Sequence, residues 1–171
     1  MSDPVFDLET RATMDDHQAL RLWLRWLSCT ARIENQIRAR LRQHFETTLP
    51  RFDLMAQLER DPDGLRMSEL SKRLMVTGGS ITGITDQLET EGLAVRIPVP
   101  SDRRATIVKL TPVGLERFRK MAAEHERWIV ELLSALSDEE QHAMLSDFRK
   151  LKIHLSSIAA SSVDGTGPLQ S

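Results

Sequence analysis

The sequence predicts a mainly α-helical fold: a winged helix-turn-helix with a two-stranded β wing, placed between N- and C-terminal helical dimerisation regions. Apolar residues recur every three or four positions over most of the 171 residues, as in amphipathic helices. The β-rich runs lie next to each other, separated by a polar and basic turn, which is typical of a hairpin. Two short helices directly precede this hairpin, and the order helix, turn, helix, wing is typical of a DNA-reading module.

Composition limits the possible functions. Lys and Arg number 23 against 25 Asp and Glu, a net charge of −2, so contact with a nucleic acid requires a local basic surface. One cysteine excludes an intrachain disulfide framework and favours a cytoplasmic protein. The first residues lack a basic and apolar leader and no long apolar run occurs, so we expect neither secretion nor a membrane span. The five histidines lack metal-ligand spacing and no nucleophile-base motif occurs; we expect no metal, no cofactor and no enzyme activity.

Boundaries follow from composition and from the positions of Pro and Gly. We expect a single domain over residues 16–158, with a flexible N-terminus over 1–15 and a flexible tail over 159–171. Within this domain, the dimerisation helices occupy residues 17–47 and 112–158, and the winged helix-turn-helix occupies residues 50–111.

The first helix is predicted from an uninterrupted apolar stripe. Residues 17–47 contain no Pro or Gly, which predicts an amphipathic helix roughly 45 Å long. Since Cys29 belongs to the stripe, its thiol is expected to be buried and inert; a redox sensor is the alternative. The stripe consists of Leu22, Trp26, Cys29, Ile33, Ile37, Leu41 and Phe45.

The later elements are delimited by caps and turns. Thr77 is a residue type that favours the N-cap position, and Gly92 is typical of the end of a helix. Ser137 and Glu140 have the spacing of a capping box. The predicted elements are a helix from Pro50 to Asp61, a helix over 68–74 with Leu70 and Leu74 buried, a helix after Thr77, strands over 93–97 and 106–110, a helix from Pro112 and a helix from Ser137.

The helix after Thr77 is the candidate recognition helix. With Ile81 turned inward, Ile84, Thr85 and Leu88 lie within about 60° of it on the helical wheel, which leaves a small, polar outer face. Such a face can approach a DNA groove closely and bond phosphates or base edges. Alternatively, the first residues of this helix only cap it, and Asp86 forms an ion pair with an arginine instead of contacting DNA. The candidate DNA-binding residues are Thr77, Gly78, Gly79, Ser80, Thr82, Gly83, Asp86 and Gln87.

The hairpin is the candidate wing. Residues 96–109 hold four basic residues and one acidic residue, a local charge of +3 on a nearly neutral chain. Arginine at a hairpin tip can enter a narrow minor groove, where the potential is most negative. The charged residues are Arg96, Arg103, Arg104 and Lys109 with Asp102, and we expect Arg103 and Arg104 to contact DNA.

Three motifs resemble the MarR family of winged-helix transcription regulators over about residues 17–158. They are Ser68-Glu-Leu-Ser-Lys-Arg-Leu, Asp86-Gln-Leu-Glu-Thr-Glu-Gly-Leu-Ala-Val-Arg and Ser101-Asp-Arg-Arg-Ala-Thr-Ile-Val-Lys-Leu-Thr-Pro-Val-Gly. The resemblance implies a homodimer that binds a pseudo-palindromic operator in double-stranded DNA, most often as a repressor released by a small ligand. It also implies that Asp102 braces the wing tip, Arg104 enters the minor groove and Arg103 contacts a phosphate.

One departure concerns base recognition. Gly78, Gly83 and Gln87 stand where many relatives carry arginines, which leaves the operator sequence open.

A small-molecule effector is suggested by arginines on the first helix. Arg21, Arg25 and Arg32 share one side, and Arg38 and Arg42 form a second basic edge; a solvated surface is the alternative. Residues 32–38, 48–55 and 75–79 resemble the MarR subgroup that responds to aromatic acids or their coenzyme A thioesters. The resemblance implies an aryl pocket with arginines at the carboxylate or phosphates. The candidate ligand-binding residues are Trp23, Arg25, Trp26, Arg32, Arg38 and Phe52.

Assembly is predicted from apolar residues at both ends of the chain. They exceed what one small winged domain can cover, which favours a two-fold dimer with recognition helices about 34 Å apart. The alternatives are a winged helix used only for protein contacts and a small hydrolase. The apolar residues concerned are Leu20, Leu24, Leu27, Met144, Phe148 and Leu155.

Overall fold

The computed structural model describes residues 18–99 and 102–163, with side chains over 18–99 and 105–158. The predicted flexible N-terminus over 1–15, and residues 164–171 of the predicted tail, lie outside these ranges. The chain divides into two compact units, Met1–Trp128 and Ile129–Ser171. The single domain predicted over residues 16–158 stays a prediction, and each unit is described by itself.

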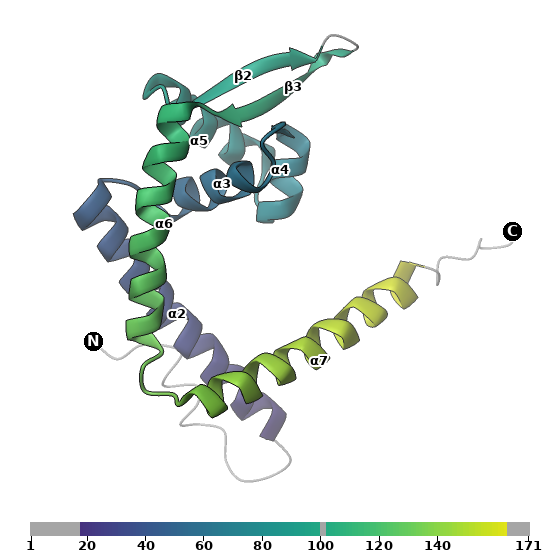
Figure 1. The fold of residues 1–171 in the computed structure, drawn as a ribbon. Coiled ribbons are helices and arrows are strands. Elements are labelled where there is room, and N and C mark those ends of the chain that lie inside the picture. The colour runs from purple at the N-terminus through teal and green to yellow at the C-terminus, as the bar shows by residue number, and fades with distance from the viewer. Residues whose placement is uncertain (1–17, 100–101, 164–171) are drawn as a thin grey trace, which may run out of the picture. The chain divides into compact units, whose positions relative to one another are not determined.

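The described elements follow the predicted order (Figure 1). The helices are α2 (Gln18–Phe45), α3 (Leu49–Arg60), α4 (Met67–Leu74), α5 (Gly78–Thr90), α6 (Pro112–Leu132) and α7 (Asp138–Val163), and the strands are β1 (Leu65–Arg66), β2 (Ala94–Val99) and β3 (Asp102–Leu110). The mainly helical fold class with a winged helix-turn-helix is therefore confirmed. None of the described helices is long and apolar enough to cross a membrane.

Helix α2 buries different sides along its length. Ile37 and Leu41 are buried, as predicted, but in the first half the buried residues are Leu24 and Ser28. At 100° per residue, Leu24 lies about 140° away from Ile37 on the helical wheel, so the covered side changes along the helix. The single predicted stripe is therefore wrong in this half. Cys29 is exposed rather than buried, which corrects the prediction of a buried thiol.

The wing belongs to a small sheet with one more strand than predicted. The antiparallel order is β1-β3-β2, with Leu65 opposite Val108 and Arg66 opposite Ile107. A strand of two residues is too short for an alternating pattern, so β1 could not be predicted from the sequence. In Figure 1 the three short helices α3, α4 and α5 lie together next to the β2–β3 hairpin.

The caps predicted from the sequence are found at the ends of the helices. Thr77 caps α5 by accepting a hydrogen bond from the Ser80 N–H at 3.4 Å. Ser137 and Glu140 form the reciprocal capping box of α7, at 3.3 and 2.8 Å. Gly92 has φ of +69°, the left-handed conformation that ends a helix.

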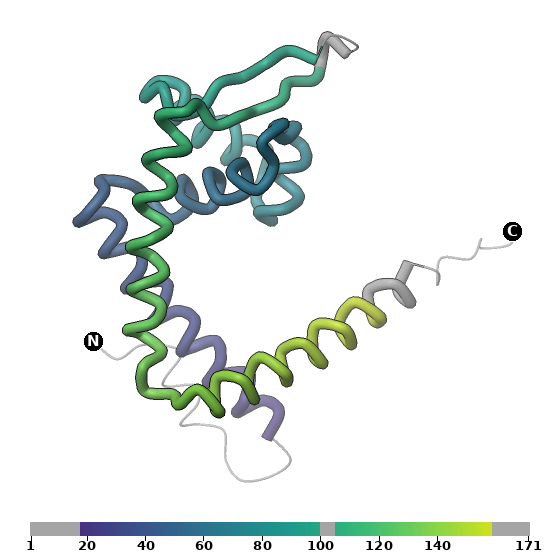
Figure 2. Tube along the Cα trace, viewed as in Figure 1, coloured from purple at the N-terminus to yellow at the C-terminus, as the bar shows by residue number. Residues whose placement is uncertain are grey.

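The passage from the wing into α6 is tightly packed. Thr111 accepts a hydrogen bond from the Gly114 N–H at 3.0 Å and donates to the Gly92 carbonyl at 2.7 Å. A Cβ atom at Gly114 would lie 1.9 Å from the Leu93 carbonyl oxygen, so only glycine fits there. Figure 2 shows the chain leaving α5, forming the hairpin and entering α6 directly.

The core of the first unit lies among the short helices, β3 and α6. Phe52 is buried and stacks on Phe118, with ring centroids 5.4 Å apart. Leu70 is fully buried as predicted, whereas Leu74 is only partly covered. The most deeply buried side chains are Leu41, Leu54, Met55, Leu58, Leu70, Ile81, Leu88, Met121 and Val108 with Thr85.

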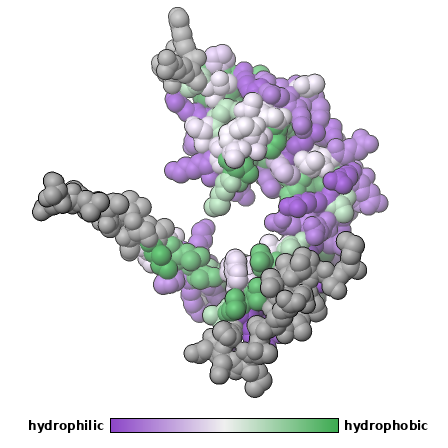
Figure 3. Space-filling model, turned by 180° about the vertical axis from the view of Figure 1, so that it is seen from behind, coloured by the Kyte–Doolittle hydropathy of each residue, from purple (hydrophilic) through white to green (hydrophobic). Residues whose placement is uncertain are grey.

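In the second unit, α7 contains no buried residue over its described side chains. Leu145 is 65% exposed and Leu155 is 54% exposed. Hydrophobic side chains gather along α7 in Figure 3. The last helix therefore presents an apolar surface to its surroundings.

Candidate nucleic-acid interface

Helix α5 has a buried and an exposed face, as predicted. Ile81, Thr85 and Leu88 are fully buried, and the Thr85 hydroxyl donates to the Ile81 carbonyl at 2.8 Å, which satisfies it inside the core. All eight predicted DNA-binding residues of this helix and its cap are exposed. They are Thr77, Gly78, Gly79, Ser80, Thr82, Gly83, Asp86 and Gln87.

The exposed face contains glycines that the packing of this chain does not require. A Cβ atom at Gly78, Gly79 or Gly83 would have no neighbouring atom within 4 Å. Glycine inside a helix costs about 0.5 to 1 kcal/mol relative to alanine. Gly83, inside the helix, therefore weakens it, and the three positions leave a surface without side chains that another backbone can approach closely.

Hydroxyl groups line the beginning of the same face. The Thr77 and Ser80 hydroxyls lie 3.0 Å apart, and the Thr82 hydroxyl donates to the Gly78 carbonyl at 3.0 Å. Thr77 is thus a helix cap, the alternative weighed from the sequence. Because each hydroxyl oxygen is also an exposed acceptor, and each keeps its position through these bonds, the groups are preorganised for a polar partner.

Arg96 of β2 contacts the candidate recognition helix, α5. Its Nη2 atom lies 2.6 Å from Asp86 Oδ1, and its Nη1 atom pairs with Glu89. Burial acts to lower the pKa of Arg96, but the hydrogen bond to Asp86 and the charge of Glu89 outweigh it and raise the pKa. Asp86 therefore forms the ion pair that was its alternative. The charge of Arg96, one of the four basic residues of the predicted wing, is thus compensated by two carboxylates.

The wing strands are paired from Ala94–Leu110 to Pro98–Thr106, with a register shift between Pro98 and Val99. The backbone of Arg103 and Arg104 belongs to β3, but their side chains lie outside the described residues. Their contacts with DNA stay predictions.

A second ion-pair group lies at the far end of α5 and was not predicted from the sequence. Arg51, buried on α3, donates to Glu91 at 2.5 Å, and Arg117 of α6 donates to the Phe45 carbonyl at 3.0 Å. The hydrogen bond from Arg51, together with the charges of Arg51 and Arg117, holds the pKa of Glu91 below its ordinary value. The partners are 40 residues apart, so no local spacing could reveal them.

The predicted ligand-binding residues form separate groups. Trp23 and Trp26 make an edge-to-face pair on α2, with centroids 5.9 Å apart, and both are exposed. Arg38 pairs with Glu34 at 2.8 Å. Phe52 instead belongs to the core, stacked on Phe118 and His125. The remaining predicted residues, Arg25 and Arg32, are exposed on α2.

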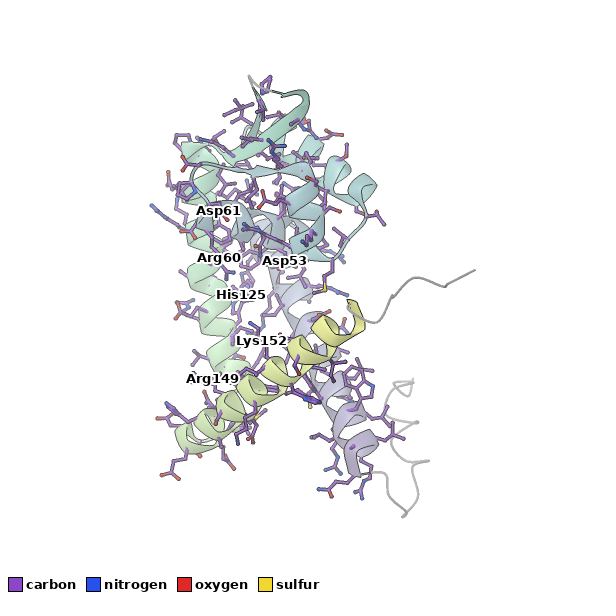
Figure 4. The ribbon with its side chains drawn as sticks, turned by 90° about the vertical axis from the view of Figure 1, so that its right-hand side faces the viewer. Asp53, Arg60, Asp61, His125, Arg149 and Lys152 are labelled. Carbon is purple, nitrogen blue, oxygen red and sulfur yellow. The ribbon has the colours of Figure 1, made fainter. Side chains whose placement is uncertain are left out.

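Two half-buried titratable groups lie beside Phe52. Asp53 follows Phe52 on α3 and His125 lies on α6; both are labelled in Figure 4. Burial raises the pKa of Asp53, the charge of Glu34 adds to the rise and that of Arg38 opposes it. Burial lowers the pKa of His125, which favours its neutral form.

Known proteins resemble this chain in sequence. The sequence pattern of the MarR family matches residues 46–105. Over 98 residues the chain is 31% identical to the uncharacterized HTH-type transcriptional regulator YdgJ of Bacillus subtilis, a match that covers 57% of this chain and 60% of that protein. The chain spans about three fifths of the length of the curated relatives that it matches.

Solved structures resemble it over a longer stretch. A MarR family transcriptional regulator from Silicibacter pomeroyi is 34% identical with a TM-score of 0.68, and the match covers 85% of this chain and 99% of that one. A mutant MarR from E. coli, complexed with operator DNA, shares the fold with a TM-score of 0.70 at 21% identity, over 81% of this chain and 99% of that one. Both matches extend well beyond the winged region.

Proposed function

This chain belongs to the MarR family of winged-helix transcription regulators, and we propose that it binds a pseudo-palindromic operator in double-stranded DNA as a homodimer and acts as a repressor. The exposed face of α5 carries the proposal. It combines three glycines that have no internal packing role with hydroxyl groups held in place, beside a hairpin that supplies Arg103 and Arg104. The mutant MarR from E. coli, which has this fold, binds operator DNA.

DNA binding is tested with a fragment that carries the promoter of the protein's own gene. We expect a specific complex whose affinity falls steeply with salt, because arginines that neutralise phosphates release counterions. Transcription from the same fragment should decrease when the protein is added. Equal affinity for all sequences, or a failure to bind any DNA, would favour the alternative of a winged helix that contacts proteins only.

The homodimer is supported by exposed apolar side chains. Leu20 and Leu27 of α2 and Leu155 of α7 are exposed, as expected of an interface, although Leu24 is buried within the chain. We propose that a second copy of this chain covers these side chains, because a two-fold symmetric operator is bound by a two-fold symmetric dimer. Sedimentation at micromolar concentration should give twice the mass of one chain. A monomer that still binds its operator tightly would contradict this part of the proposal.

We further propose that an aromatic acid, or its coenzyme A thioester, releases the protein from DNA. The support is the Trp23–Trp26 pair on α2 and the arginines of the same helix, whose planar groups suit carboxylates and phosphates. Phe52 would act from the core, through its stack with Phe118 and His125. Ligand binding would favour a dimer with recognition helices at the wrong spacing, so that the operator empties.

The effector test measures release from labelled operator by benzoyl- and hydroxycinnamoyl-coenzyme A and by the free acids. Arg32→Gln or Arg38→Gln should blunt release without weakening DNA binding, and Arg127→Gln on α6 is the matched control. Release by the free acids alone would identify a simpler aromatic-acid sensor. Indifference to both classes would remove the effector proposal and leave DNA binding intact.

A further inference from the structure

The side chain of Arg96 joins the wing to the recognition helix at three positions. Its Nη2 atom lies 2.6 Å from Asp86 and donates to the Thr82 carbonyl at 3.4 Å, while Nη1 pairs with Glu89. The backbone N–H of Arg96 also donates to Glu89 Oε1, at 2.9 Å. One residue of β2 therefore contacts α5 through both its backbone and its guanidinium.

These three partners lie along one edge of α5. Thr82, Asp86 and Glu89 fall within about 60° on the helical wheel and span about 10 Å of the helix axis. The Arg96 side chain is only 25% exposed, so it lies flat along this edge rather than extending into solvent. Two turns of the helix are thus attached to one point of the hairpin. Since β2 pairs with β3 from Ala94 to Pro98, a rotation at Arg96 would move the hairpin as a whole.

The charge of this cluster argues against a direct contact between Arg96 and DNA. One guanidinium faces two carboxylates, so the cluster has a net charge of −1 and offers no free cation to a phosphate. The carboxylates also oppose the approach of DNA electrostatically. Arg96 thus has the geometry of a brace between two DNA-facing elements.

We propose that Arg96 is a positioning residue for DNA recognition, which sets the angle between the wing and helix α5. With this angle fixed, α5 lies in the major groove while the hairpin reaches the neighbouring minor groove of the same site. The inference rests on the proposed DNA binding and adds a residue that determines how the two reading elements act together. Loss of the brace loosens the wing but leaves α5 intact.

The test compares footprints of Arg96→Gln and Glu89→Ala with the wild type on the promoter fragment. Dimethyl sulfate reports guanine N7 in the major groove, and hydroxyl radicals report the minor groove. For both variants we expect retained guanine protection, weaker minor-groove protection beside it and about five- to tenfold lower affinity. Arg127→Gln removes an arginine from an exposed pair with Glu124 on α6 and should behave as the wild type.

Glu89→Ala separates positioning from direct contact because it removes a negative charge. If Arg96 contacted phosphate itself, freeing it from Glu89 would tighten DNA binding; if Arg96 is a brace, the same change weakens binding and reduces wing protection. Tighter binding with full minor-groove protection would therefore overturn the proposal. So would a lower melting temperature of Arg96→Gln with an unchanged footprint. A wild-type protein that binds no DNA would instead overturn the proposed function, and this inference with it.

Discussion

The winged region and the last helix differ in how far their apolar residues are buried. Between α3 and β3, Leu54, Leu70 and Val108 are fully buried inside the chain. On α7, Leu145 and Leu155 are more than half exposed, and no described side chain of that helix is buried. Burial of apolar surface is the main favourable term in folding. The winged region is therefore stabilised by its own packing, whereas the apolar side chains of α7 are left exposed.

In the proposed function, DNA recognition and dimer formation would therefore depend on different regions of the chain. The residues proposed to contact DNA stand on the region with a complete core, which holds them in position without a second chain. In the proposed homodimer, the spacing between two copies of that region would depend on helices outside it, such as α7 with its exposed apolar side chains. Stability and operator affinity are therefore expected to depend on protein concentration.

Leu155→Glu should abolish the dimer. Met144, Phe148, Leu151 and Leu155 recur at steps of four and three, so they share one side of α7. A charge on this side disfavours burial against a second copy. We expect a monomer in sedimentation and about 100-fold weaker operator binding, because two linked sites become one.

The control for Leu155→Glu lies on the same helix. Ile153 is 66% exposed and lies about 160° from Leu155 on the helical wheel, so Ile153→Glu makes the same change on the other side. It should leave the dimer and the operator affinity unchanged. If both variants dissociate the dimer equally, the apolar side of α7 is not the interface.

Arg104→Ala should have the next largest effect. Loss of an arginine from the minor groove is expected to weaken specific binding by about 1 to 3 kcal/mol. Arg103→Ala should lower affinity more evenly across sequences and reduce the salt slope by about one, as expected of a phosphate contact. Titrations of operator and unrelated DNA at several salt concentrations measure both. An Arg103, Arg104 double alanine variant that binds the operator like the wild type would show that the wing is not used.

The regular elements of the winged region were predictable because their signals are local. A cap at Thr77, a stop at Gly92 and the spacing of Ile81, Thr85 and Leu88 fix where α5 lies and which side it buries. These interactions link residues within one or two turns of helix. The exposed face of the candidate site was therefore predicted correctly from the sequence.

What could not be predicted depends on distant partners. Arg51 and Glu91 are 40 residues apart, so no local spacing connects them. An ion pair between Asp86 and an arginine was among the alternatives, but the sequence did not indicate that Arg96 is the partner or that it also contacts Glu89. The exposure of Cys29 has the same origin, since the covered side of α2 depends on which segments pack against it. Periodicity identifies a helix, but the neighbours decide which of its sides is buried.

Gly83→Ala should raise stability and lower DNA affinity. Alanine is favoured over glycine in a helix by about 0.5 to 1 kcal/mol, and a Cβ atom at this position meets nothing in the chain. The same methyl group would stand between α5 and a close-lying DNA backbone. Chemical denaturation should therefore show a higher free energy of unfolding, whereas titration of the operator should show a lower affinity. A variant that is more stable and binds equally well would show that the glycine face does not touch DNA.

Glu91→Gln should give the smallest effect and a characteristic pH dependence. Arg51 and Arg117 hold the pKa of Glu91 below its ordinary value of about 4.5. An acid with a lowered pKa in the folded state contributes stability above its unfolded pKa and loses that contribution as the pH falls through the folded pKa. The wild type should therefore be more stable than the variant at pH 6 to 7, and the difference should shrink as the pH falls below about 4.5 and through the lowered folded pKa of Glu91. Since Glu91 is 39% exposed, water screens the pair and the difference is expected to stay below about 1 kcal/mol. Urea unfolding from pH 3 to 7 measures it, with Glu126→Gln at an exposed position of α6 as the control. Equal destabilisation by Glu91→Gln at pH 3 and pH 7 would mean that its charge is not what holds the end of α5.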